Sequence, residues 1–225
     1  LLNEPERQAV LKLYAKQPGG LANARPLGTT LGALGGEIVR LSAAETGKKV
    51  EVLIGGAPGE LDRQVLERML APFEHMLRNA IVHGIELPAA RVAAGKDETG
   101  VIDVTLKREG SEVVITVADD GAGVNLKLVR DRAVALGLIT PKQELSDEQA
   151  LQLILEPGFS TAGKVTQSAG RGVGMDVVAT EIKKLGGSLY TETWTGKGTK
   201  FTVRLPFTLA ISQALVTRVG DELYA

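Results

Sequence analysis

The sequence predicts an α/β protein, because segments with the period of a helix and segments with the period of a strand are mixed along the chain. Residues 60–83 carry apolar side chains at helical spacing over a length typical of a long helix. Residues 101–107 and 112–118 each alternate between apolar and polar, and the glycine-bearing turn at 108–111 between them favours a hairpin.

The other elements are assigned in chain order. A short helical pattern over residues 1–17 ends in a linker rich in proline and glycine, and Pro72 should kink the long helix or mark a junction between two helices. Ser146 with Gln149 suits a capping box, and residues 156–171 form a long loop. Further helices are expected over 28–46, after Pro88, and over 126–137, 146–155 and 175–185; strands over 49–54, 188–194, 199–204, 214–219 and 222–225; and a turn over 55–59.

Composition excludes several classes of function. The 225 residues include 26 Lys and Arg against 27 Asp and Glu, so no basic excess indicates a nucleic-acid partner. There are no cysteines, which removes disulfides and thiolate metal sites. No apolar run reaches membrane-spanning length and no signal-peptide pattern is present, so we expect a cytoplasmic protein without membrane insertion. Because Leu1 is not an initiator methionine, we expect an excised fragment.

The most informative segment carries both histidines of the chain. His75, Asn79 and His83 are spaced i, i+4, i+8, which places their side chains on one stripe of a helix. Such a stripe can meet a metal ion or a phosphate, but a helix with a solvated polar edge has the same pattern. The segments downstream decide between the two interpretations.

Two glycine-rich segments suggest ligand contacts. Asp119 follows a strand directly, and Gly121 and Gly123 permit a sharp turn and a close backbone approach to a ligand. A buried Asp at a strand end can accept a hydrogen bond from an exocyclic amine such as adenine N6, although an ordinary strand–turn–helix connection would look the same. Gly170, Gly172 and Gly174 open a helix, where bare N–H groups bind phosphate.

The spacing of this second segment matches neither common phosphate loop. Met175 stands at the position of the third glycine of a Rossmann fingerprint, one residue after Gly174, and no Walker A sequence is present. Between the two glycine-rich segments, residues 157–161 (Pro-Gly-Phe-Ser-Thr) lie in the long loop, where Lys164 and Arg171 can reach anionic oxygens. A surface loop without a ligand remains the alternative.

The four segments in this order resemble the N, G1, F and G2 boxes of the ATP-binding domain shared by histidine kinases, gyrase, Hsp90 and MutL. The sequences of these segments are most similar to those of the chemotaxis-type (CheA-like) histidine kinases. The resemblance covers roughly residues 37–225, and it rests on the sequences at 78–86 (RNAxxHGIE, where x is any residue), 157–161 (PGFST), 170–178 (GRGVGMDVV), 198–199 (GT) and 205–211 (LPFTLAI).

The resemblance implies a two-layer α/β sandwich, the GHKL or Bergerat fold, with a mixed, mainly antiparallel sheet covered by helices on one face. It implies a catalytic ATP-binding domain over residues 28–206 and the truncated start of an SH3-like, CheW-like regulatory domain over 207–225. Residues 1–27 stay an unassigned N-terminal segment.

The resemblance also implies ATP and Mg²⁺ as the ligands of the site. Asp119 would accept from adenine N6, with Thr199 completing the adenine end, and Asn79 would ligate Mg²⁺ through its amide oxygen. Catalytic roles fall to His75, Asn79 and His83, and His75 should lie beside the γ-phosphate, as a base or as a contact. The remaining expected ATP contacts are Arg78, Gly121, Gly123, Lys164, Gly170, Arg171, Gly172, Gly174 and Met175.

The first position of the N box separates the branches of this superfamily. The ATP-hydrolysing members and ordinary sensor kinases have Glu there, whereas this chain has His75, which favours transfer to a protein histidine over hydrolysis. Val82 and Ala122 stand where the chemotaxis kinases have Asp and often Arg, and we expect them to tune activity. His75 and His83 are the only histidines, so if both serve the ATP site the phosphoacceptor should lie elsewhere. The resemblance implies that it lies on a separate phosphotransfer (Hpt) domain.

The expected partners are the phosphotransfer domain, on the same protein or its dimer mate, a CheW-like adaptor and a response regulator. We expect the full-length protein to be a homodimer. Two other functions share parts of the pattern. A stand-alone ATPase of the gyrase, Hsp90 and MutL kind is disfavoured by His75 and by the segment at 157–161. A degenerate nucleotide-binding or scaffolding module would act through its SH3-like tail.

Overall fold

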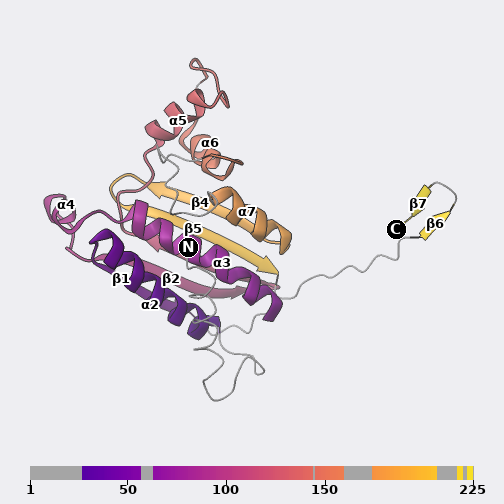
Figure 1. The fold of residues 1–225 in the computed structure, drawn as a ribbon, viewed down its shortest axis with the longest axis horizontal. Helices are drawn as coiled ribbons and strands as arrows, with labels where there is room; N and C mark the ends of the chain where they lie inside the picture. The colour runs from indigo at the N-terminus through magenta and orange to yellow at the C-terminus, as the bar shows by residue number, and fades with distance from the viewer. Residues whose placement is uncertain are drawn as a thin grey trace.

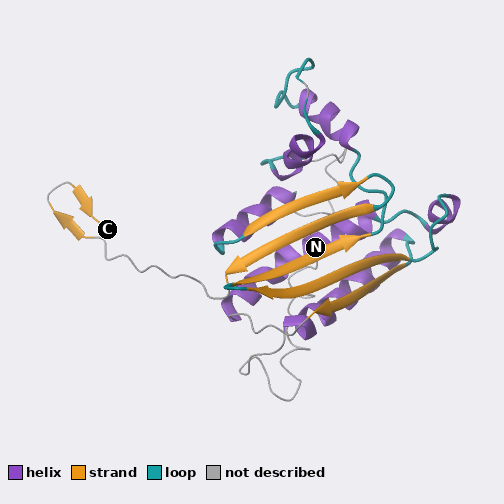
Figure 2. Cartoon of the chain, turned by 180° about the vertical axis from the view of Figure 1, so that it is seen from behind, coloured by secondary structure: helices purple, strands orange, loops and turns teal. Residues whose placement is uncertain are grey.

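A five-stranded mixed sheet forms one layer of the molecule (Figures 1 and 2). The computed structural model describes residues 27–56, 63–143, 145–159, 174–206, 217–219 and 222–224. The strand order is β1-β2-β3-β5-β4; β1 and β2 run parallel, and every other neighbouring pair is antiparallel. The strands are β1 (Val50–Gly56), β2 (Gly100–Glu109), β3 (Glu112–Asp119), β4 (Ser188–Trp194) and β5 (Gly198–Pro206).

Three helices, α2 (Leu27–Thr46), α3 (Arg63–Asn79) and α7 (Met175–Lys184), form the second layer. They lie in front of the sheet in Figure 1 and behind it in Figure 2, so they cover one face. The buried core lies between the layers, and it includes Met69, Phe73 and Leu77 of α3 facing Ile115 of β3 and Val203 of β5. Burying such side chains contributes about 1.5–3 kcal/mol each. The predicted two-layer α/β sandwich is therefore confirmed.

The long helix expected over residues 60–83 has a different form. α3 runs through Pro72 as one helix, so the junction between two helices does not lie there. Packing of its apolar face offsets the roughly 3 kcal/mol that an internal proline costs. The change of geometry comes at Asn79, after which residues Ala80–Gly84 form a π-helical turn, η1. Residues 57–62, where the expected helix begins, lie outside the described residues.

Gly55 and Gly56, expected in a turn over 55–59, belong to β1 instead, and residues 57–59 lie outside the described residues. Gly56 has a φ of +113°, and a Cβ there would stand 2.0 Å from the carbonyl oxygen of Leu106 on the neighbouring strand. The glycine thus serves strand pairing. Likewise, β2 and β3 extend into the turn expected over 108–111, leaving a two-residue connection in which Gly110 has a φ of +61°.

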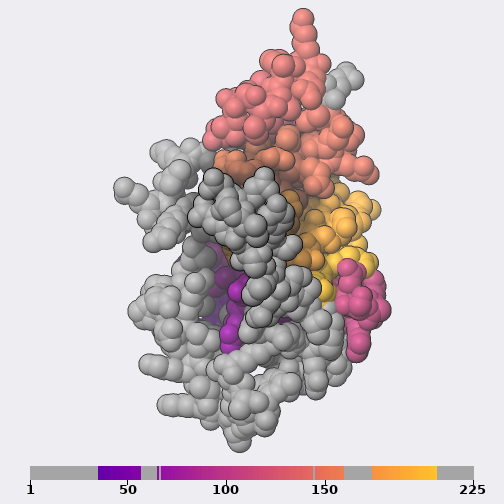
Figure 3. Space-filling model, turned by 90° about the vertical axis from the view of Figure 1, so that its right-hand side faces the viewer, coloured from indigo at the N-terminus to yellow at the C-terminus, as the bar shows by residue number. Residues whose placement is uncertain are grey.

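The remaining predicted elements within the described residues are present. The capping box forms at Ser146, where Gln149 N–H donates to its hydroxyl and the Gln149 side chain accepts from its backbone N–H. The elements are α4 (Pro88–Ala93), α5 (Leu126–Ala135), α6 (Asp147–Gln152), a 3₁₀ turn η2 (Leu153–Leu155), and the antiparallel strands β6 (Thr217–Val219) and β7 (Glu222–Tyr224). In the space-filling view of Figure 3, α5 and α6 project from one end of the sandwich.

Several expectations fall outside the described residues: the helical pattern and linker over 1–26 and most of the loop at 156–171. The domain boundaries and the CheW-like nature of the β6–β7 pair stay predictions. Among the helices that the structure describes, none combines the length and apolarity needed to cross a membrane.

Candidate functional site

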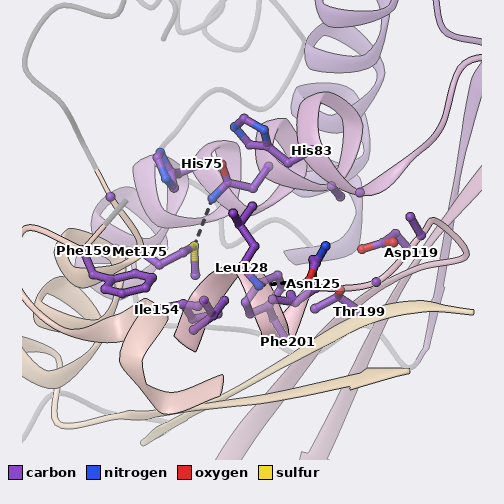
Figure 4. A pocket seen from close by; sticks show the side chains of 18 residues that line it. His75, His83, Asp119, Asn125, Leu128, Ile154, Phe159, Met175, Thr199 and Phe201 are labelled. Carbon is purple, nitrogen blue, oxygen red and sulfur yellow. Dashed lines mark hydrogen bonds between the residues drawn. The ribbon is translucent and has the colours of Figure 1, made fainter. Parts of the chain in front are cut away.

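A pocket of about 570 Å³ lies between α3 with η1 on one side and, on the other, the turn that follows β3, α5, the start of α7 and the start of β5 (Figure 4). Residues far apart in the sequence meet there because α3, β3, β5 and α7 are neighbours in the sandwich. Its lining consists of His75, Asn79, Ala80, His83, Gly84, Asp119, Ala122, Gly123, Val124, Asn125, Leu128, Val129, Ile154, Phe159, Gly174, Met175, Thr199 and Phe201.

The predicted polar stripe forms one wall of this pocket. His75, Asn79 and His83 all line it, even though the helix changes from α to π geometry after Asn79. Figure 4 shows the two histidines on this wall, with Asp119 at the far end of the pocket. The interpretation as a plain solvated edge is therefore disfavoured, since the three side chains share one cavity.

His75 is buried, with 9% of its surface exposed, and its Nδ1 has no hydrogen-bond partner among the described residues. Burial lowers the pKa of His75 from 6.5 to about 4, and the charge of nearby Arg78, together with that of His83 when it is protonated, acts in the same direction. The imidazole is therefore neutral at pH 7. An unpaired nitrogen on the wall of a cavity is a group that a bound ligand or its water can satisfy.

Asn79 is held by a contact across the pocket. Its Nδ2 donates to Sδ of Met175, the first residue of α7, over 3.1 Å (Figure 4). Because the amide nitrogen is engaged in this way, the amide oxygen is the atom that the side chain can offer to a cation. This arrangement joins two of the predicted site residues that lie 96 positions apart.

The π-helical turn that carries His83 is fixed by Lys48, at the connection between α2 and β1. The Lys48 ammonium donates to the carbonyl oxygens of Ile81 and Val82 at 2.9 and 2.6 Å. Burial, together with the charge of Lys48, lowers the pKa of His83, although the residue as a whole is exposed. Both effects favour the neutral form of the imidazole.

Asp119 ends β3 and is 8% exposed. Its Oδ1 accepts from the Gly121 N–H at 2.9 Å. Burial raises the pKa of Asp119 from 3.8 to about 6, against the opposing hydrogen bonds from the backbone of Gly121 and Thr199. At pH 7 the group is thus mostly a carboxylate, which can accept a hydrogen bond from a ligand.

The glycines after Asp119 approach the protein's own backbone. A Cβ on Gly121 would lie 2.1 Å from the Gly84 carbonyl oxygen, and one on Gly123, whose φ is +75°, would lie 2.5 Å from the Trp194 carbonyl oxygen. Gly198, the first residue of β5, packs in the same way, since a Cβ on it would lie 1.8 Å from the carbonyl oxygen of Asp119. Close packing of the turn against η1 and the β4–β5 turn explains these glycines.

The side chain of Ala122 takes no part in this packing. Its N–H donates to Gly84 at 2.9 Å, its carbonyl accepts from Gly196 at 2.8 Å, and the residue is exposed. A longer side chain at this position is therefore not needed for the shape of the turn.

A magnesium ion fits the donor set. The described residues contain no group of three or more His, Cys, Asp or Glu that could enclose a metal. Mg²⁺ needs no such cage, because it keeps most of its shell as water and substrate phosphate oxygens and takes one or two protein ligands. A single amide oxygen from Asn79 meets that requirement.

The other predicted contacts have different placements. Gly174 and Met175 line the pocket, where Gly174 precedes the first turn of α7, and Thr199 lines it from β5. Arg78 is not among the lining residues, and its guanidinium lies 3.6 Å from the Glu45 carboxylate. Lys164, Gly170, Arg171 and Gly172 lie outside the described residues, so their phosphate contacts stay predictions.

Several residues that support the site were not predicted. Thr193 of β4 accepts from the Val124 N–H at 2.8 Å and lies 3.2 Å from the Thr199 hydroxyl, which ties the β4–β5 hairpin to the turn after β3. Arg91 of α4 and Lys96 bind Glu86 and the same turn. The charged residues after η1 were visible in the sequence, but their spacing gave no sign that one of them is fully buried.

Residues 69–209, more than half of the chain, match the protein family described as histidine kinase-, DNA gyrase B-, and HSP90-like ATPase. The five-stranded sheet and its helical layer, with the pocket between α3 and the turn after β3, define the class: an ATP-binding domain of the GHKL type. The chain belongs to this family, and within it to the chemotaxis-type (CheA-like) histidine kinase catalytic domains.

Curated relatives support the placement among the CheA-like kinases. The chain is 43% identical over 188 residues to the chemotaxis protein CheA of Treponema pallidum, covering 84% of this chain and 23% of that protein. It is 44% identical over 185 residues to CheA of Rhizobium meliloti, covering 82% and 24%. The chain thus spans about a quarter of the length of these relatives.

Among solved structures, the histidine kinase domain of the Erythrobacter litoralis EL346 blue-light-activated kinase has a similar fold. The TM-score is 0.52 at 17% identity, covering 88% of this chain and 70% of that one. At this identity the likeness supports the fold alone.

Proposed function

We propose that this domain binds Mg-ATP and transfers the γ-phosphoryl group to a histidine on a separate phosphotransfer domain, within a chemotaxis- or twitching-motility-type two-component system. The observation that carries the proposal is one pocket lined by the buried carboxyl group of Asp119 at one end and by the amide of Asn79 beside a neutral His75 at the other. We assign Asp119 as the adenine acceptor and Asn79 as the metal ligand. The size of the pocket, about 570 Å³, is within the range of small-molecule sites.

At the adenine end, the Asp119 carboxylate would accept a hydrogen bond from the exocyclic amine of the base, and the turn after it shapes the cavity. Apolar side chains from α5 and β5, Leu128, Val129 and Phe201, provide surface for a flat base. Leu128 is 48% exposed, which leaves apolar area at the mouth of the pocket for a ligand to cover.

At the phosphate end, Asn79 would hold Mg²⁺, which supplies positive charge against the phosphate oxygens. His75, being neutral, can accept a hydrogen bond from a water of the metal shell or donate one to a phosphate oxygen. Phosphoryl transfer depends mainly on positioning and charge stabilisation, so these groups suffice without a nucleophile from the protein.

The number of histidines indicates where the phosphoacceptor lies. The chain has two, and both line the pocket. We therefore propose that the acceptor histidine lies outside this chain. From the family we propose three further partners of the full-length protein: a CheW-like adaptor, a response regulator and a second protomer. A cytoplasmic location stays a prediction.

The test incubates the chain with γ-labelled ATP and Mg²⁺, with and without a phosphotransfer domain from a chemotaxis kinase. We expect label on the acceptor domain and none on the chain alone. His75→Gln should reduce the transfer rate by about 10²-fold or more, since a group beside the reacting phosphoryl is lost.

Two other outcomes would change the assignment. Steady release of phosphate without any acceptor would favour a stand-alone ATPase, and failure to bind a fluorescent ATP analogue would favour a scaffolding module. Absence of label on the acceptor, with nucleotide binding intact, would contradict the kinase assignment.

The metal assignment has its own test. Asn79→Ala should abolish the Mg²⁺-dependent part of nucleotide affinity, because the amide oxygen that ligates the ion is removed. Titration of ATP with and without Mg²⁺ by calorimetry measures this part directly. Equal Mg²⁺ dependence in the variant and the unaltered chain would mean that the metal is held elsewhere.

A further inference from the structure

Four charged residues form a cluster beside the turn that follows β3, and the proposed catalytic steps do not use them. They are Glu86, which follows η1, Arg91 in α4, Lys96 after α4, and Asp120. Arg91 has only 1% of its side chain exposed, the lowest value among the charged groups of the described ion pairs. A charge is buried to this extent only where partners satisfy it.

All three nitrogens of the Arg91 guanidinium have partners. Nε donates to the Asp97 carbonyl at 2.7 Å, and the two terminal nitrogens form a bidentate pair with the Asp120 carboxylate at 3.0 and 2.7 Å. One terminal nitrogen also donates to Glu86 at 3.1 Å. Bidentate pairs of this kind fix orientation as well as distance.

Lys96 completes the cluster with three hydrogen bonds. Its ammonium donates at 2.8 Å to the Glu86 carboxylate and at the same distance to the carbonyl oxygens of Asp120 and Gly121. The Asp120 side chain also accepts from the Val101 N–H at 3.0 Å, which ties it to β2. The cluster therefore holds both residues that follow Asp119, including Gly121, whose N–H donates to the Asp119 carboxylate.

The charges of the cluster balance, with two cations against two carboxylates. The charged groups near Asp119 are Asp120 on its own turn, Glu86 after η1, and the two cations from α4 and the segment after it; His83 of η1 lines the same pocket. The charges of Asp120 and Glu86 both raise the pKa of Asp119. Arg91 and Lys96 offset those charges at distances at which Coulomb interactions are strong.

We propose that Arg91 and Lys96 are positioning residues for adenine recognition: they fix the backbone of the turn after Asp119 and neutralise the two carboxylates beside it, so that Asp119 presents a charged acceptor to the base. The inference rests on the proposed ATP function. It adds two residues that touch neither adenine nor phosphate.

The principal variant is Lys96→Met, which keeps an apolar stem and removes the charge. The pH midpoint of Asp119 should rise by about half a unit or more, because an uncompensated carboxylate is left beside it. Carbon-13 NMR of labelled aspartate carboxyls measures this without any ligand, with Asp119→Asn to assign the signal. The affinity for ADP should fall roughly threefold below the midpoint and less above it.

Two further variants separate charge from shape. Lys96→Met combined with Glu86→Gln restores the balance of charges and should return the midpoint to its original value. Arg91→Lys keeps the charge but loses the bidentate pair, so ADP affinity should fall at every pH without a shift of the midpoint. Lys184→Met, which removes an exposed partner of Glu181, serves as the surface control.

An Asp119 titration that is unchanged in Lys96→Met would overturn the inference, whether or not the variant binds nucleotide. A shifted midpoint that Glu86→Gln fails to restore would overturn it as well, since a general structural loss would then explain the shift. Failure of the unaltered chain to bind ADP would overturn the proposed function and the adenine role together.

Discussion

At the scale of single residues, Asp119 shows how burial and function oppose each other. Its pKa, about 6, is above the ordinary 3.8, because burial penalises the carboxylate. The folded chain therefore binds this proton more tightly than the unfolded chain does. The resulting stabilisation is fully present below about pH 4 and is lost as the pH rises through about 6. At pH 7 the charged acceptor lowers the stability of the fold.

Asp119→Asn should therefore raise the free energy of unfolding at pH 7 by about 1–2 kcal/mol. At every pH above 6 the variant should be at least as stable as the unaltered chain. Nucleotide affinity should fall by about tenfold, because an amide accepts a hydrogen bond less strongly than a carboxylate. Urea unfolding at pH 5 and 8, with calorimetric ADP titrations at both values, checks the two effects. A variant that is less stable at pH 8 would contradict the assigned pKa.

The residues of the site differ in how far sequence could predict them. His75, Asn79 and Asp119 were expected in the site because their segments resemble those of a known family, whereas helix and strand patterns alone left an interpretation without a ligand open. Arg91 was not, because its partner Asp120 lies 29 positions away and nothing in the sequence indicates burial of a charge. The Asn79–Met175 contact, across 96 positions, was equally hidden, although both residues were named as site residues.

At the scale of elements, the β4–β5 turn contains two glycines of different function. Both have positive φ, +74° at Gly196 and +110° at Gly198. Only Gly198 lies against other backbone, since a Cβ on it would stand 1.8 Å from the carbonyl oxygen of Asp119. A Cβ on Gly196 would meet nothing within 4 Å. The turn therefore offers a matched pair for separating backbone strain from close approach.

Gly198→Ala should lower the free energy of unfolding by about 3 kcal/mol or more, since the Asp119 strand must move, and nucleotide affinity should fall with it. Gly196→Ala should cost about 1 kcal/mol, the strain of the left-handed conformation alone. Chemical denaturation of the two variants measures the difference. Equal losses would show that the close approach relaxes easily.

The π-helical turn η1 also depends on a residue from elsewhere. Lys48 donates to two of its carbonyl oxygens, whereas the adjacent Lys49 makes an exposed pair with Glu98 at 2.6 Å. Lys48→Met should lower the free energy of unfolding by about 1–3 kcal/mol, because hydrogen bonds from a charged donor are lost. Lys49→Met should change it by less than about 0.5 kcal/mol. Urea denaturation of both variants is the measurement, and similar values would contradict the role of Lys48.

Elements were predicted better than their geometry. The apolar period marked α3, but the same period continues into η1, so the switch to a π-helix at Ala80 could not be read from spacing. The strand order was also beyond periodicity: β5 inserts between β3 and β4. The mixed sheet was expected only because the chain resembles a known family.

At the scale of the whole molecule, the pocket joins α3, β3, α5, α7 and β5, so a ligand there stabilises most of the sandwich at once. Nucleotide with Mg²⁺ at a hundred times its Kd should raise the free energy of unfolding by about 2.7 kcal/mol. For a domain of this size the Tm should rise by roughly 5–10 °C. Thermal scans with Asn79→Ala as the control check this, and a similar rise in the control would place the metal elsewhere.

The close approach of Gly123 to the Trp194 carbonyl has an optical consequence. Trp194 is the only tryptophan of the chain, it is 48% exposed, and it ends β4, which packs on the turn that follows β3. Its intrinsic emission therefore comes from one known place beside the pocket. Movement of that turn when a nucleotide enters can be followed by stopped-flow fluorescence on the unaltered chain, without any attached dye.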